Sequence, residues 1–595
     1  MKYSDALMDW LVEAGYTHCF FVGGGNVMHL LESARTRFDC IAVVHEVAAA
    51  IGAEYFNEAQ KENNRKAFAM VTAGPGVTNL VTGVSGAWLE SRELLIIAGQ
   101  ARTDAMSDGK IRQVGHQEIN AVGIMSPITK YAITAKKPIS KLDMQKIFNL
   151  SNSGRKGPVF VEFCLDVTGS NFISETPTAE LNIPEDPKKV LKSNDVDMIE
   201  QLLRESKRPI FLFGGGLNRQ FTKSVYNQLI SLGIPIATTW NGADKFPSNN
   251  NLYAGRPNTY GMRFGNVITQ QADLLVAFGT RLGLQQTGFN WQEFLPAGKL
   301  VQIEIDEAEL LKDNPTKHLS INADANVILQ ELLNREINLD IEEWRKYVLD
   351  VRKTLPLKDA ANIAREDYVE PFDFVLELQS ITGENDQIIP CSSGGAFTTM
   401  MQAFELKSNQ IMITDKGLAS MGYGLSGAIG ASVAYPDLRT ILTEGDGGFA
   451  QNLQELGTAS LRNLNLKIFI YSNQGYASIR TMQKSYFNGN YVGCDAQTGV
   501  GLPNWNKIFD SFNIPNVTMD RNLFKNDKVL DLFHKKGTAG FILPLDPEQG
   551  YFPKVLSKVM PDGKMKSNPI HLMAPDLNLE TKKEVFKYIP KELWQ

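Results

Sequence analysis

The chain has 595 residues, a formal net charge of −6 and 43% hydrophobic residues. This length is too great for one hydrophobic core and predicts about three or four domains. No apolar run approaches the roughly 20 residues that a membrane-spanning helix needs, and the N-terminal segment has no apolar signal core. The mild negative charge argues against a general surface for nucleic acid or acidic membranes. We therefore expect a cytoplasmic protein that binds neither nucleic acid nor membrane.

Cysteine and histidine usage limits the metal and redox chemistry. The five cysteines are odd in number, widely spaced and without a C-x-x-C pair, which argues against a disulfide framework and against zinc. No H-E-x-x-H or comparable histidine spacing occurs, so a catalytic zinc site is not expected either.

The first part of the chain alternates helices with short apolar strands. Helices are predicted over 4–15, 27–34 and 47–59, and strands over 18–22, 41–44 and 67–71. Continuous apolar strands that alternate with helices indicate a parallel sheet covered on both faces. Ligands of such sheets bind at the carboxyl ends of strands, where the glycine turns at 23–25 and 74–76 lie.

The rest of the chain contains two further segments in which helices alternate with apolar strands. A charged, proline-containing stretch over 176–194 reads as a linker, and strands are then predicted over 209–213, 274–278 and 300–306. After a polar, helical connection over 338–366, further strands are predicted over 388–389, 411–413, 440–442 and 467–470. We expect an α/β protein with three doubly wound parallel-sheet domains, at 1–175, 195–335 and 370–555, and a C-terminal tail over 556–595 packed on a neighbouring surface.

Two polar residues at predicted strand ends suggest a divalent-cation site. Asp446, between Gly445 and Gly447, follows one strand and precedes a helix predicted over 452–461, and Asn473 follows the next strand. Magnesium prefers a few protein oxygens together with phosphate and water oxygens, and the backbone carbonyl of Gly475 could add a third ligand. The alternative is a tight turn followed by an unrelated Asn, but the spacing favours the metal site.

Glu46 opens a predicted helix directly after a buried-looking strand. Thiamine diphosphate needs a carboxyl group on its pyrimidine ring, because that contact drives the tautomer shift that activates the cofactor. Taken alone, Glu46 also reads as a helix-start acid favoured by the helix dipole. Together, Glu46 and the Asp446–Asn473 pair indicate a thiamine-diphosphate enzyme with magnesium. The glycine turns lack the G-x-G-x-x-G pattern, so a dinucleotide fingerprint is not met.

Ordered matches along nearly the whole chain resemble the acetohydroxyacid synthase-like family of thiamine-diphosphate enzymes. They comprise His45-Glu46, the stretch from Thr72 to Leu80, Gly115-His116-Gln117-Glu118, Pro127 to Lys130, Met421 to Leu425, and Gly445-Asp446-Gly447 with Asn473. The resemblance implies a pyrimidine-binding domain first, a central domain second and a diphosphate-binding domain third. It also implies a homodimer or homotetramer, because Glu46 of one subunit acts on cofactor held by the partner's third domain.

The same resemblance assigns roles to individual positions. Glu46, Gln117 and His116 are the expected catalytic residues, and Met421 matches the bulky residue that props thiamine in its bent form. The expected metal ligands are Asp446, Asn473 and Gly475. The remaining expected cofactor contacts are Gly74, Asn79, Gly394, Gly395, Gly445, Gly447 and Gly448.

Departures from the family pattern concern the substrate. Gln285 stands where acetolactate synthases have an Arg for the carboxylate of the second keto acid, and Met482 stands where they have a Trp. Loss of a bidentate cation weakens carboxylate recognition, so an uncharged acceptor is favoured. His116 stands where acetolactate synthases have a Phe, beside the expected active-site residue Gln117. In these respects the chain is more similar to family members of surface-polysaccharide pathways, which transfer an acetyl unit to a keto nucleotide sugar.

Four functions therefore remain open for small-molecule substrates. The favoured one is a carboligase that decarboxylates pyruvate or a similar 2-keto acid and transfers the acyl unit to a carbonyl acceptor. The others are an acetolactate synthase proper, a simple 2-keto-acid decarboxylase, and a non-catalytic cofactor-binding subunit, which the intact Glu46, Asp446 and Asn473 disfavour. FAD is a further candidate cofactor, because Gly214-Gly215-Gly216 and Arg281 match flavin-binding members.

Overall fold

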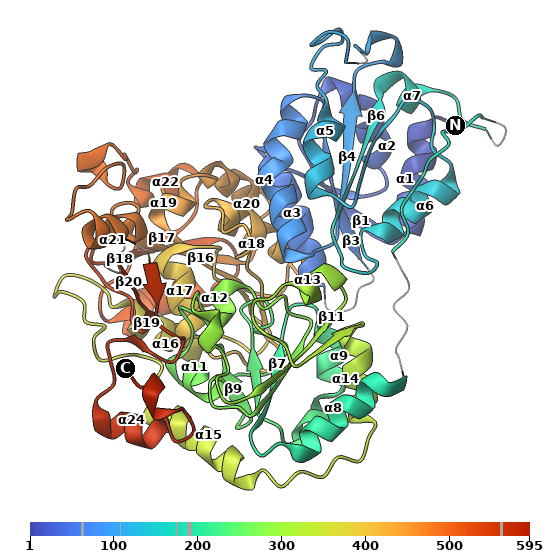
Figure 1. The fold of residues 1–595 in the computed structure, drawn as a ribbon. Coiled ribbons are helices and arrows are strands. Elements are labelled where there is room, and N and C mark those ends of the chain that lie inside the picture. The colour runs from blue at the N-terminus through green and yellow to red at the C-terminus, as the bar shows by residue number, and fades with distance from the viewer. Residues whose placement is uncertain (61–64, 108, 174–175, 187–192, 560–562, 564) are drawn as a thin grey trace.

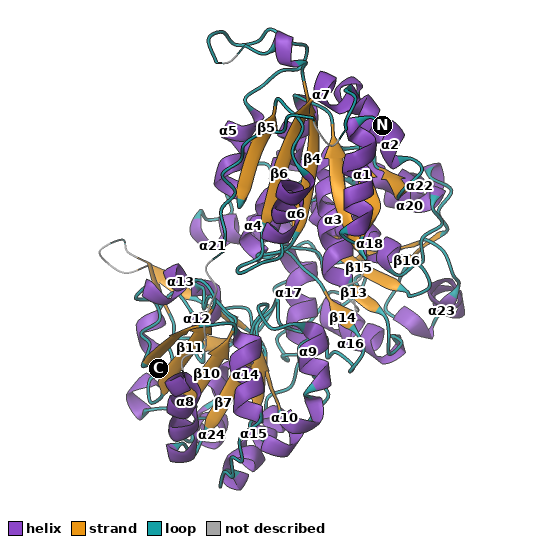
Figure 2. Ribbon diagram, turned by 90° about the vertical axis from the view of Figure 1, so that its right-hand side faces the viewer, coloured by secondary structure: helices purple, strands orange, loops and turns teal. Residues whose placement is uncertain are grey.

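The chain forms three sheet-containing domains in a computed structural model that describes residues 1–595 except 61–64, 108, 174–175, 187–192, 560–562 and 564. Within the described residues, each domain contains one six-stranded sheet whose strand pairs are all parallel. Helices cover both faces of these sheets (Figures 1 and 2). The prediction of an α/β fold with three doubly wound parallel sheets is confirmed.

The first sheet has the strand order β2-β1-β3-β4-β6-β5. Its strands are β1 (Tyr16–Phe21), β2 (Asp39–Ala42), β3 (Lys66–Val71), β4 (Leu94–Gln100), β5 (Tyr131–Ala135) and β6 (Pro158–Cys164). Its helices are α1 (Tyr3–Glu13), α2 (Met28–Ala34), α3 (Glu46–Ala59), α4 (Pro75–Glu90), α5 (Ala121–Met125), α6 (Lys141–Leu150) and α7 (Leu165–Gly169).

The second sheet has the order β12-β11-β10-β7-β8-β9. Its strands are β7 (Pro209–Phe213), β8 (Ile236–Thr238), β9 (Tyr253–Gly255), β10 (Leu274–Phe278), β11 (Lys299–Glu304) and β12 (Leu319–Asn322). Its helices are α8 (Ser193–Glu205), α9 (Arg219–Ser224), α10 (Tyr226–Leu232), α11 (Arg263–Thr269), α12 (Leu284–Thr287), α13 (Glu307–Leu311) and α14 (Ala325–Leu333), and α15 (Glu342–Thr354) leads to the third domain.

The third sheet has the order β14-β13-β15-β16-β18-β17. Its strands are β13 (Gln387–Ile389), β14 (Ile411–Met412), β15 (Thr440–Gly445), β16 (Leu466–Ser472), β17 (Asn516–Thr518) and β18 (Ala539–Pro544). Its helices are α16 (Pro371–Ile381), α17 (Gly394–Ala403), α18 (Tyr423–Ala434), α19 (Asp446–Phe449), α20 (Leu456–Leu461), α21 (Ala477–Tyr486), α22 (Trp505–Ser511) and α23 (Asp527–His534).

The C-terminal segment returns to the second domain. It contains the two-stranded pairs β19 (Lys554–Val555) with β22 (Met573–Ala574) and β20 (Ser557–Val559) with β21 (Met565–Ser567), and then α24 (Leu579–Val585). Apolar side chains of this segment, such as Ile570 and Phe586, belong to the same buried cluster as the core of the second sheet.

The first and third domains share a hydrophobic core along helices α3 and α18. Both helices carry small residues at their contact: a Cβ on Gly430 would lie 2.2 Å from the carbonyl oxygen of Gly52, and one on Gly427 would lie 2.6 Å from the Tyr55 ring. A larger residue at either glycine would push the helices apart. This contact fixes the first domain on the third within one chain.

Three predicted elements differ from the structure for identifiable reasons. Strand β2 ends at Ala42 and not at 44, because the amides of Val44 and His45 donate to Glu455 of the third domain instead of to a strand neighbour. Strand β11 ends at Glu304 and not at 306, because the Glu304 carboxylate accepts the Ile305 amide at 3.0 Å. The helix predicted over 452–461 begins as a 3₁₀ turn, Leu453–Glu455, before α20.

None of the helices in the described part of the chain combines the length and the apolar character needed to cross a membrane.

Candidate functional site

Asp446 lies at the carboxyl end of β15 and opens helix α19. Its carboxylate is buried and accepts the backbone amide of Gly447 at 2.8 Å and that of Gln474 at 2.9 Å. Burial raises the pKa of Asp446 to about 7, although these backbone hydrogen bonds oppose the shift. A bound cation would offset the cost of burying the ionised carboxylate, so Asp446 is well placed to act as a metal ligand.

Asn473 follows the adjacent strand β16, so the parallel pairing brings its side chain beside Asp446. The amide oxygen of Asn473 faces only other acceptors: that side of the amide lies 3.3 Å from Asp446 Oδ1 and 2.9 Å from the Gly475 carbonyl oxygen. Turning the amide over would satisfy these oxygens with an N–H₂ donor. We favour the oxygen-inward orientation, because three oxygens that converge in this way fit a small hard cation such as Mg²⁺.

This oxygen set contains a single carboxylate. Among the residues that the structure describes, no group of three or more His, Cys, Asp and Glu could hold a metal ion. A cation at Asp446 would therefore keep positions open for non-protein oxygens, as magnesium does when it binds a diphosphate.

Glycines line the space beside these oxygens. Gly475 has φ +134°, and a Cβ on it would lie 2.2 Å from the Cys494 carbonyl oxygen, so only glycine fits there without displacement. Gly445 and Gly394, the latter with φ +78° at the start of α17, have nothing within 4 Å of a Cβ position. The backbone is thus accessible at both strand ends. By contrast, a Cβ on Gly395 or Gly447 would meet the ring of Tyr551 or Tyr476, and one on Gly448 would approach Glu444.

Glu46 is the first residue of α3 and is partly exposed. Its Oε2 accepts a hydrogen bond of 2.9 Å from the side-chain amide of Asn79 on α4. The second carboxylate oxygen has no hydrogen-bond partner among the described residues. Two predicted residues from separate helices are therefore joined, and one oxygen stays free for a ligand.

Gly74 and Gln117 meet next to this pair. Gly74 caps α4 with φ +63°, and a Cβ on it would lie 2.7 Å from the Gln117 carbonyl oxygen. Gln117 itself has φ +62°, and the imidazole-bearing residue His116 beside it is exposed. The predicted residues of the first domain therefore lie on neighbouring segments.

Glu118, which the motif includes without an assigned role, shapes this loop. It is buried and accepts the backbone amides of Ser107, Val114 and Gly115 at 2.6, 2.8 and 3.2 Å. Burial would raise the pKa of Glu118, but these hydrogen bonds outweigh it and lower the pKa to about 2. Glu118 thus stays ionised and holds the backbone that presents His116 and Gln117.

The two halves of the predicted site make no direct polar contact with each other within the described part of the chain. No hydrogen bond or ion pair between described residues joins Glu46 to Asp446 or Asn473. Glu54 contacts Tyr423 and Gly52 contacts Gly430, so the middle of α3 packs against α18. The amides of Val44 and His45, next to Glu46, donate to Glu455 of the third domain.

Met421 lies in the segment 414–422 between β14 and α18, and its side chain is 39% exposed. The carbonyl of Ser420 accepts from the hydroxyl of Ser392, two residues before Gly394, and the carbonyl of Gly422 accepts from Asn452 at 2.6 Å. Met421 therefore sits between the Gly394 segment and the segment that follows Asp446. We refer to 414–422 as the Met421 loop.

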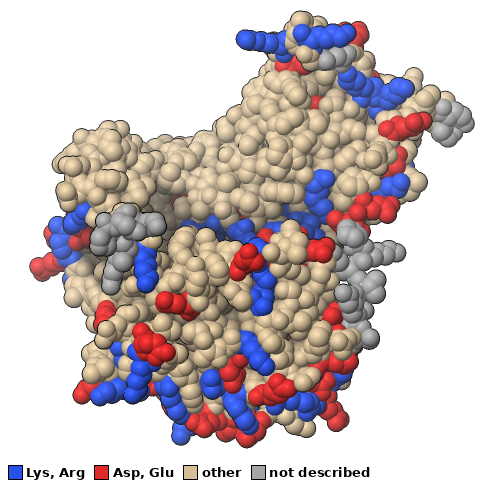
Figure 3. Space-filling view, viewed as in Figure 1, with Lys and Arg blue, Asp and Glu red and all other residues tan. Residues whose placement is uncertain are grey.

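A cavity of about 1000 Å³ lies where the three domains meet. Eight Lys and Arg side chains line it, against four Asp and Glu, although the whole chain is acidic. Figure 3 shows Lys and Arg side chains along the seam below the first domain. The predicted positions Gly215, Gly216, Arg281 and Gln285 all line this cavity. Its volume and charge suit an anionic ligand of nucleotide size.

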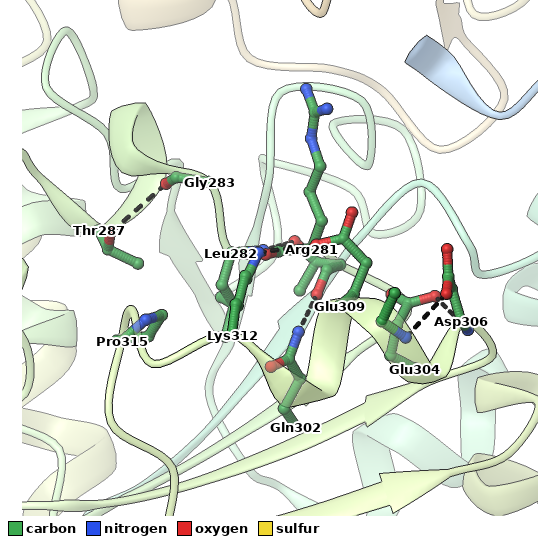
Figure 4. Close-up of polar contacts among 12 residues, drawn as sticks. Arg281, Leu282, Gly283, Thr287, Gln302, Glu304, Asp306, Glu309, Lys312 and Pro315 are labelled. Atoms are coloured by element: carbon green, nitrogen blue, oxygen red, sulfur yellow. Dashed lines mark hydrogen bonds and ion pairs between the residues drawn. The ribbon is translucent and has the colours of Figure 1, made fainter. Parts of the chain in front are cut away.

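Arg281 projects from the end of β10 without a hydrogen-bond or ion-pair partner among the described residues (Figure 4). Its backbone carbonyl accepts from the Lys312 ammonium, which also pairs with Glu309 at 2.8 Å. Arg155 of the first domain pairs with Asp306 at 2.7 Å and with Glu309 at 3.1 Å. The acids near Arg281 are thus occupied by other cations, which leaves its guanidinium available to a ligand.

Sequence reasoning missed the polar residues that join the domains around this cavity, among them Glu90, Arg92 and Lys416. Asp415-Lys416, directly after an apolar strand, was an available signal, since polar residues at the carboxyl end of a parallel strand often line a site. Glu90 at the end of α4 carries no such local signal.

Family models match three parts of the chain. Residues 1–124 match the N-terminal TPP binding domain of thiamine pyrophosphate enzymes, residues 196–332 match their central domain, and residues 393–539 match their C-terminal TPP binding domain. The order of the matches agrees with the order of the three sheets.

Curated relatives match over most of their length. A probable acetolactate synthase large subunit of Methanocaldococcus jannaschii is 30% identical, with 86% of this chain and 87% of the relative covered. An acetolactate synthase of Arabidopsis thaliana, described as chloroplastic, is 28% identical, with 95% of this chain and 85% of the relative covered. The acetolactate synthase isozyme 1 large subunit of Escherichia coli strain K12 is 26% identical, with 93% of this chain and 95% of the relative covered.

Proposed function

Because the chain belongs to the acetolactate synthase-like family of thiamine-diphosphate enzymes, we propose that it is a carboligase with an uncharged acceptor. It would decarboxylate a 2-keto acid, with pyruvate the expected donor, and transfer the acyl unit to a ketone or aldehyde. The observation that carries the thiamine-diphosphate part is the convergence of the Asp446, Asn473 and Gly475 oxygens beside accessible glycine backbone.

Each of these residues has a defined role in this proposal. Asp446, Asn473 and the Gly475 carbonyl would hold Mg²⁺ on the diphosphate, with Gly394 and Gly445 at the phosphate oxygens. Bound thiamine diphosphate supplies the centre that accepts the electron pair released by decarboxylation. Glu46 would give its free oxygen to the pyrimidine ring, while Asn79 fixes the carboxylate. His116 and Gln117 would contact the substrate.

Two chains would build each site. The family resemblance implies that Glu46 of one chain acts on cofactor held by the third domain of a partner, so each site would be completed by the first domain of the other chain. Much of the face formed by the first and third domains shows no charged side chain in Figure 3, as expected for a surface that pairs with a second copy. We propose a homodimer or homotetramer in the cytoplasm.

The acceptor proposal depends on Gln285 and Met482. Gln285 is exposed at the cavity and presents an amide instead of a guanidinium, so it offers no bidentate contact to a carboxylate. Met482 on α21 is 43% exposed and adds an apolar surface. A neutral acceptor avoids the cost of an unpaired carboxylate, and a keto nucleotide sugar is one such acceptor.

The basic cavity could serve either of two ligands with a diphosphate and a ribose. One is FAD, which Arg281 would contact at a phosphate and Glu304, at the end of β11, at a ribose hydroxyl. Since decarboxylation and carbon–carbon bond formation together transfer no net electrons, flavin would have a structural role. The other is the nucleotide part of the acceptor. Flavin absorbance released on denaturation of the purified protein would identify FAD.

The function is tested by product analysis with thiamine diphosphate and Mg²⁺ present. The protein is incubated with pyruvate alone and with pyruvate plus a 4-keto-6-deoxy nucleotide sugar. We expect a branched adduct in the second reaction and little acetolactate in the first. Efficient acetolactate formation from pyruvate alone would identify an acetolactate synthase, and acetaldehyde as sole product in both would identify a simple decarboxylase.

The substitution Gln285→Arg tests the acceptor assignment within the chain. It should raise acetolactate formation at the expense of the native adduct, by a small factor because one cation without supporting contacts is held poorly. Gln285→Leu is the matched control, since it changes the side chain without adding charge. Equal acetolactate yields from the two variants would contradict the role given to this position.

A further inference from the structure

We propose that Glu90 is a positioning residue that holds the Met421 loop against the first domain of the same chain. This inference rests on the proposed function, because Met421 matters only if the third domain binds thiamine diphosphate. It gives the first domain a second role. Glu46 of this domain would serve the partner's cofactor, whereas the end of its helix α4 would support the cofactor of its own chain.

The Glu90 carboxylate joins all three domains. Its Oε1 accepts the backbone amide of Lys416 at 2.6 Å and also that of Gly417, both in the Met421 loop. Its Oε2 accepts from the side-chain amide of Asn241 in the second domain. A carboxylate that takes two consecutive backbone amides fixes the direction of that backbone more tightly than a contact to a side chain would.

Neighbouring groups of the first domain hold both ends of the same loop. Arg92 donates to the Thr414 carbonyl at 2.6 Å and to Glu54 at 2.8 Å, and Tyr423 donates to the other Glu54 oxygen at 2.5 Å. Glu54 and Tyr423 are fully buried and Arg92 is nearly so, which makes these charge-assisted contacts costly to break. The loop is therefore held at its start, its middle and its end.

The fit between the loop and α4 leaves no room for adjustment. A Cβ on Gly417 would lie 2.9 Å from Cβ of Leu89 and 3.2 Å from Glu90 Oε1. Within the loop, Asp415 accepts the amides of Leu418 and Ala419 at 3.2 Å each, and Ala419 has φ +57°. A loop bent this way would relax if the Glu90 contact were lost, and Met421, four residues after Gly417, would move with it.

Four variants of the full-length protein test this role: Glu90→Ala, Glu90→Gln, Gly417→Ala and, as control, Glu93→Ala. Glu93 lies three residues after Glu90 but pairs with Lys66 inside the first domain, at 2.7 Å. For each variant, the affinity for thiamine diphosphate is measured by titration with Mg²⁺ present. The value of kcat is measured at saturating cofactor, and the melting temperature is measured separately.

Glu90→Ala and Gly417→Ala should each weaken thiamine diphosphate binding by about tenfold and lower kcat, as expected for loss of a charge-assisted contact. Glu90→Gln should stay closer to wild type, because its amide oxygen can still accept both loop amides, and Glu93→Ala should match wild type. If Glu90→Ala does not fold, Gly417→Ala decides.

Wild-type affinity and kcat in folded Glu90→Ala and Gly417→Ala would overturn the inference, whether or not the melting temperature of these two variants falls. Failure of the wild-type protein to bind thiamine diphosphate would instead overturn the proposed function, so the two failures are distinguishable.

Discussion

Replacing Glu46 by Gln changes the chemistry of the proposed site while keeping its shape. Asn79 donates its side-chain amide to Oε2 of Glu46, so a Gln at this position must present its oxygen to Asn79. Its NH₂ group then takes the place of the free carboxylate oxygen. The pyrimidine ring would meet a donor that cannot exchange a proton with it, and activation of the cofactor would fail.

The expected loss follows from this geometry. Removing a general acid–base group costs about 10²- to 10⁴-fold in turnover, or roughly 2.7–5.4 kcal/mol of transition-state stabilisation. Asn79→Ala removes only the positioning hydrogen bond, worth about 1.5–3 kcal/mol when one partner is charged, and the partial exposure of Glu46 favours the lower end. We therefore expect a loss of about tenfold from Asn79→Ala.

The assay compares kcat for pyruvate consumption at saturating cofactor, with thiamine diphosphate affinity measured separately by titration. Because Asn79 acts through Glu46, the double variant should be no slower than Glu46→Gln alone. Near-normal turnover of Glu46→Gln with cofactor bound would refute the reasoning, and fully additive losses would show that Asn79 acts independently.

Two further predictions concern the metal and pH. Asp446→Ala should weaken Mg²⁺ and thiamine diphosphate binding together, since the ion would bridge protein and diphosphate; unchanged calorimetric affinities would place the metal elsewhere. Burial raises the pKa of Glu162 from 4.5 to about 7, against hydrogen bonds from Thr134 and Gln100. The unfolded chain releases this proton at a lower pH than the folded chain does. The free energy of unfolding should therefore fall by roughly 3 kcal/mol as pH rises from 4.5 to 7. Glu162→Gln should remove this part of the pH dependence of thermal melting, and an unchanged profile would contradict the assignment.

Much of the fold was predictable, because its signals are local. Strand β10 was predicted at its observed bounds, since five consecutive apolar residues flanked by turn residues define a buried parallel strand. The neighbourhood of Asp446 and Asn473 was predictable for a similar reason: adjacent parallel strands end at one edge of a sheet, so the side chains that follow them meet there.

Contacts between domains were not predictable in this way. The end of β2 is set by Glu455, which is more than four hundred residues away in the sequence and takes the amides of Val44 and His45. Glu90 reads as an ordinary acid at the end of a helix, yet it holds a loop of the third domain. Such roles depend on how separate domains pack, and neither periodicity nor spacing encodes that arrangement.

Complementation between inactive variants tests the central claim, a site built from Glu46 of one chain and Asp446 of another. Glu46→Gln and Asp446→Ala proteins are each assayed alone and after co-expression. In a mixed dimer one site carries both substitutions and the other carries neither. With random pairing, half of the dimers are mixed, so co-expression should restore about one quarter of wild-type activity. Co-expressed protein that stays as inactive as either variant alone would contradict the claim.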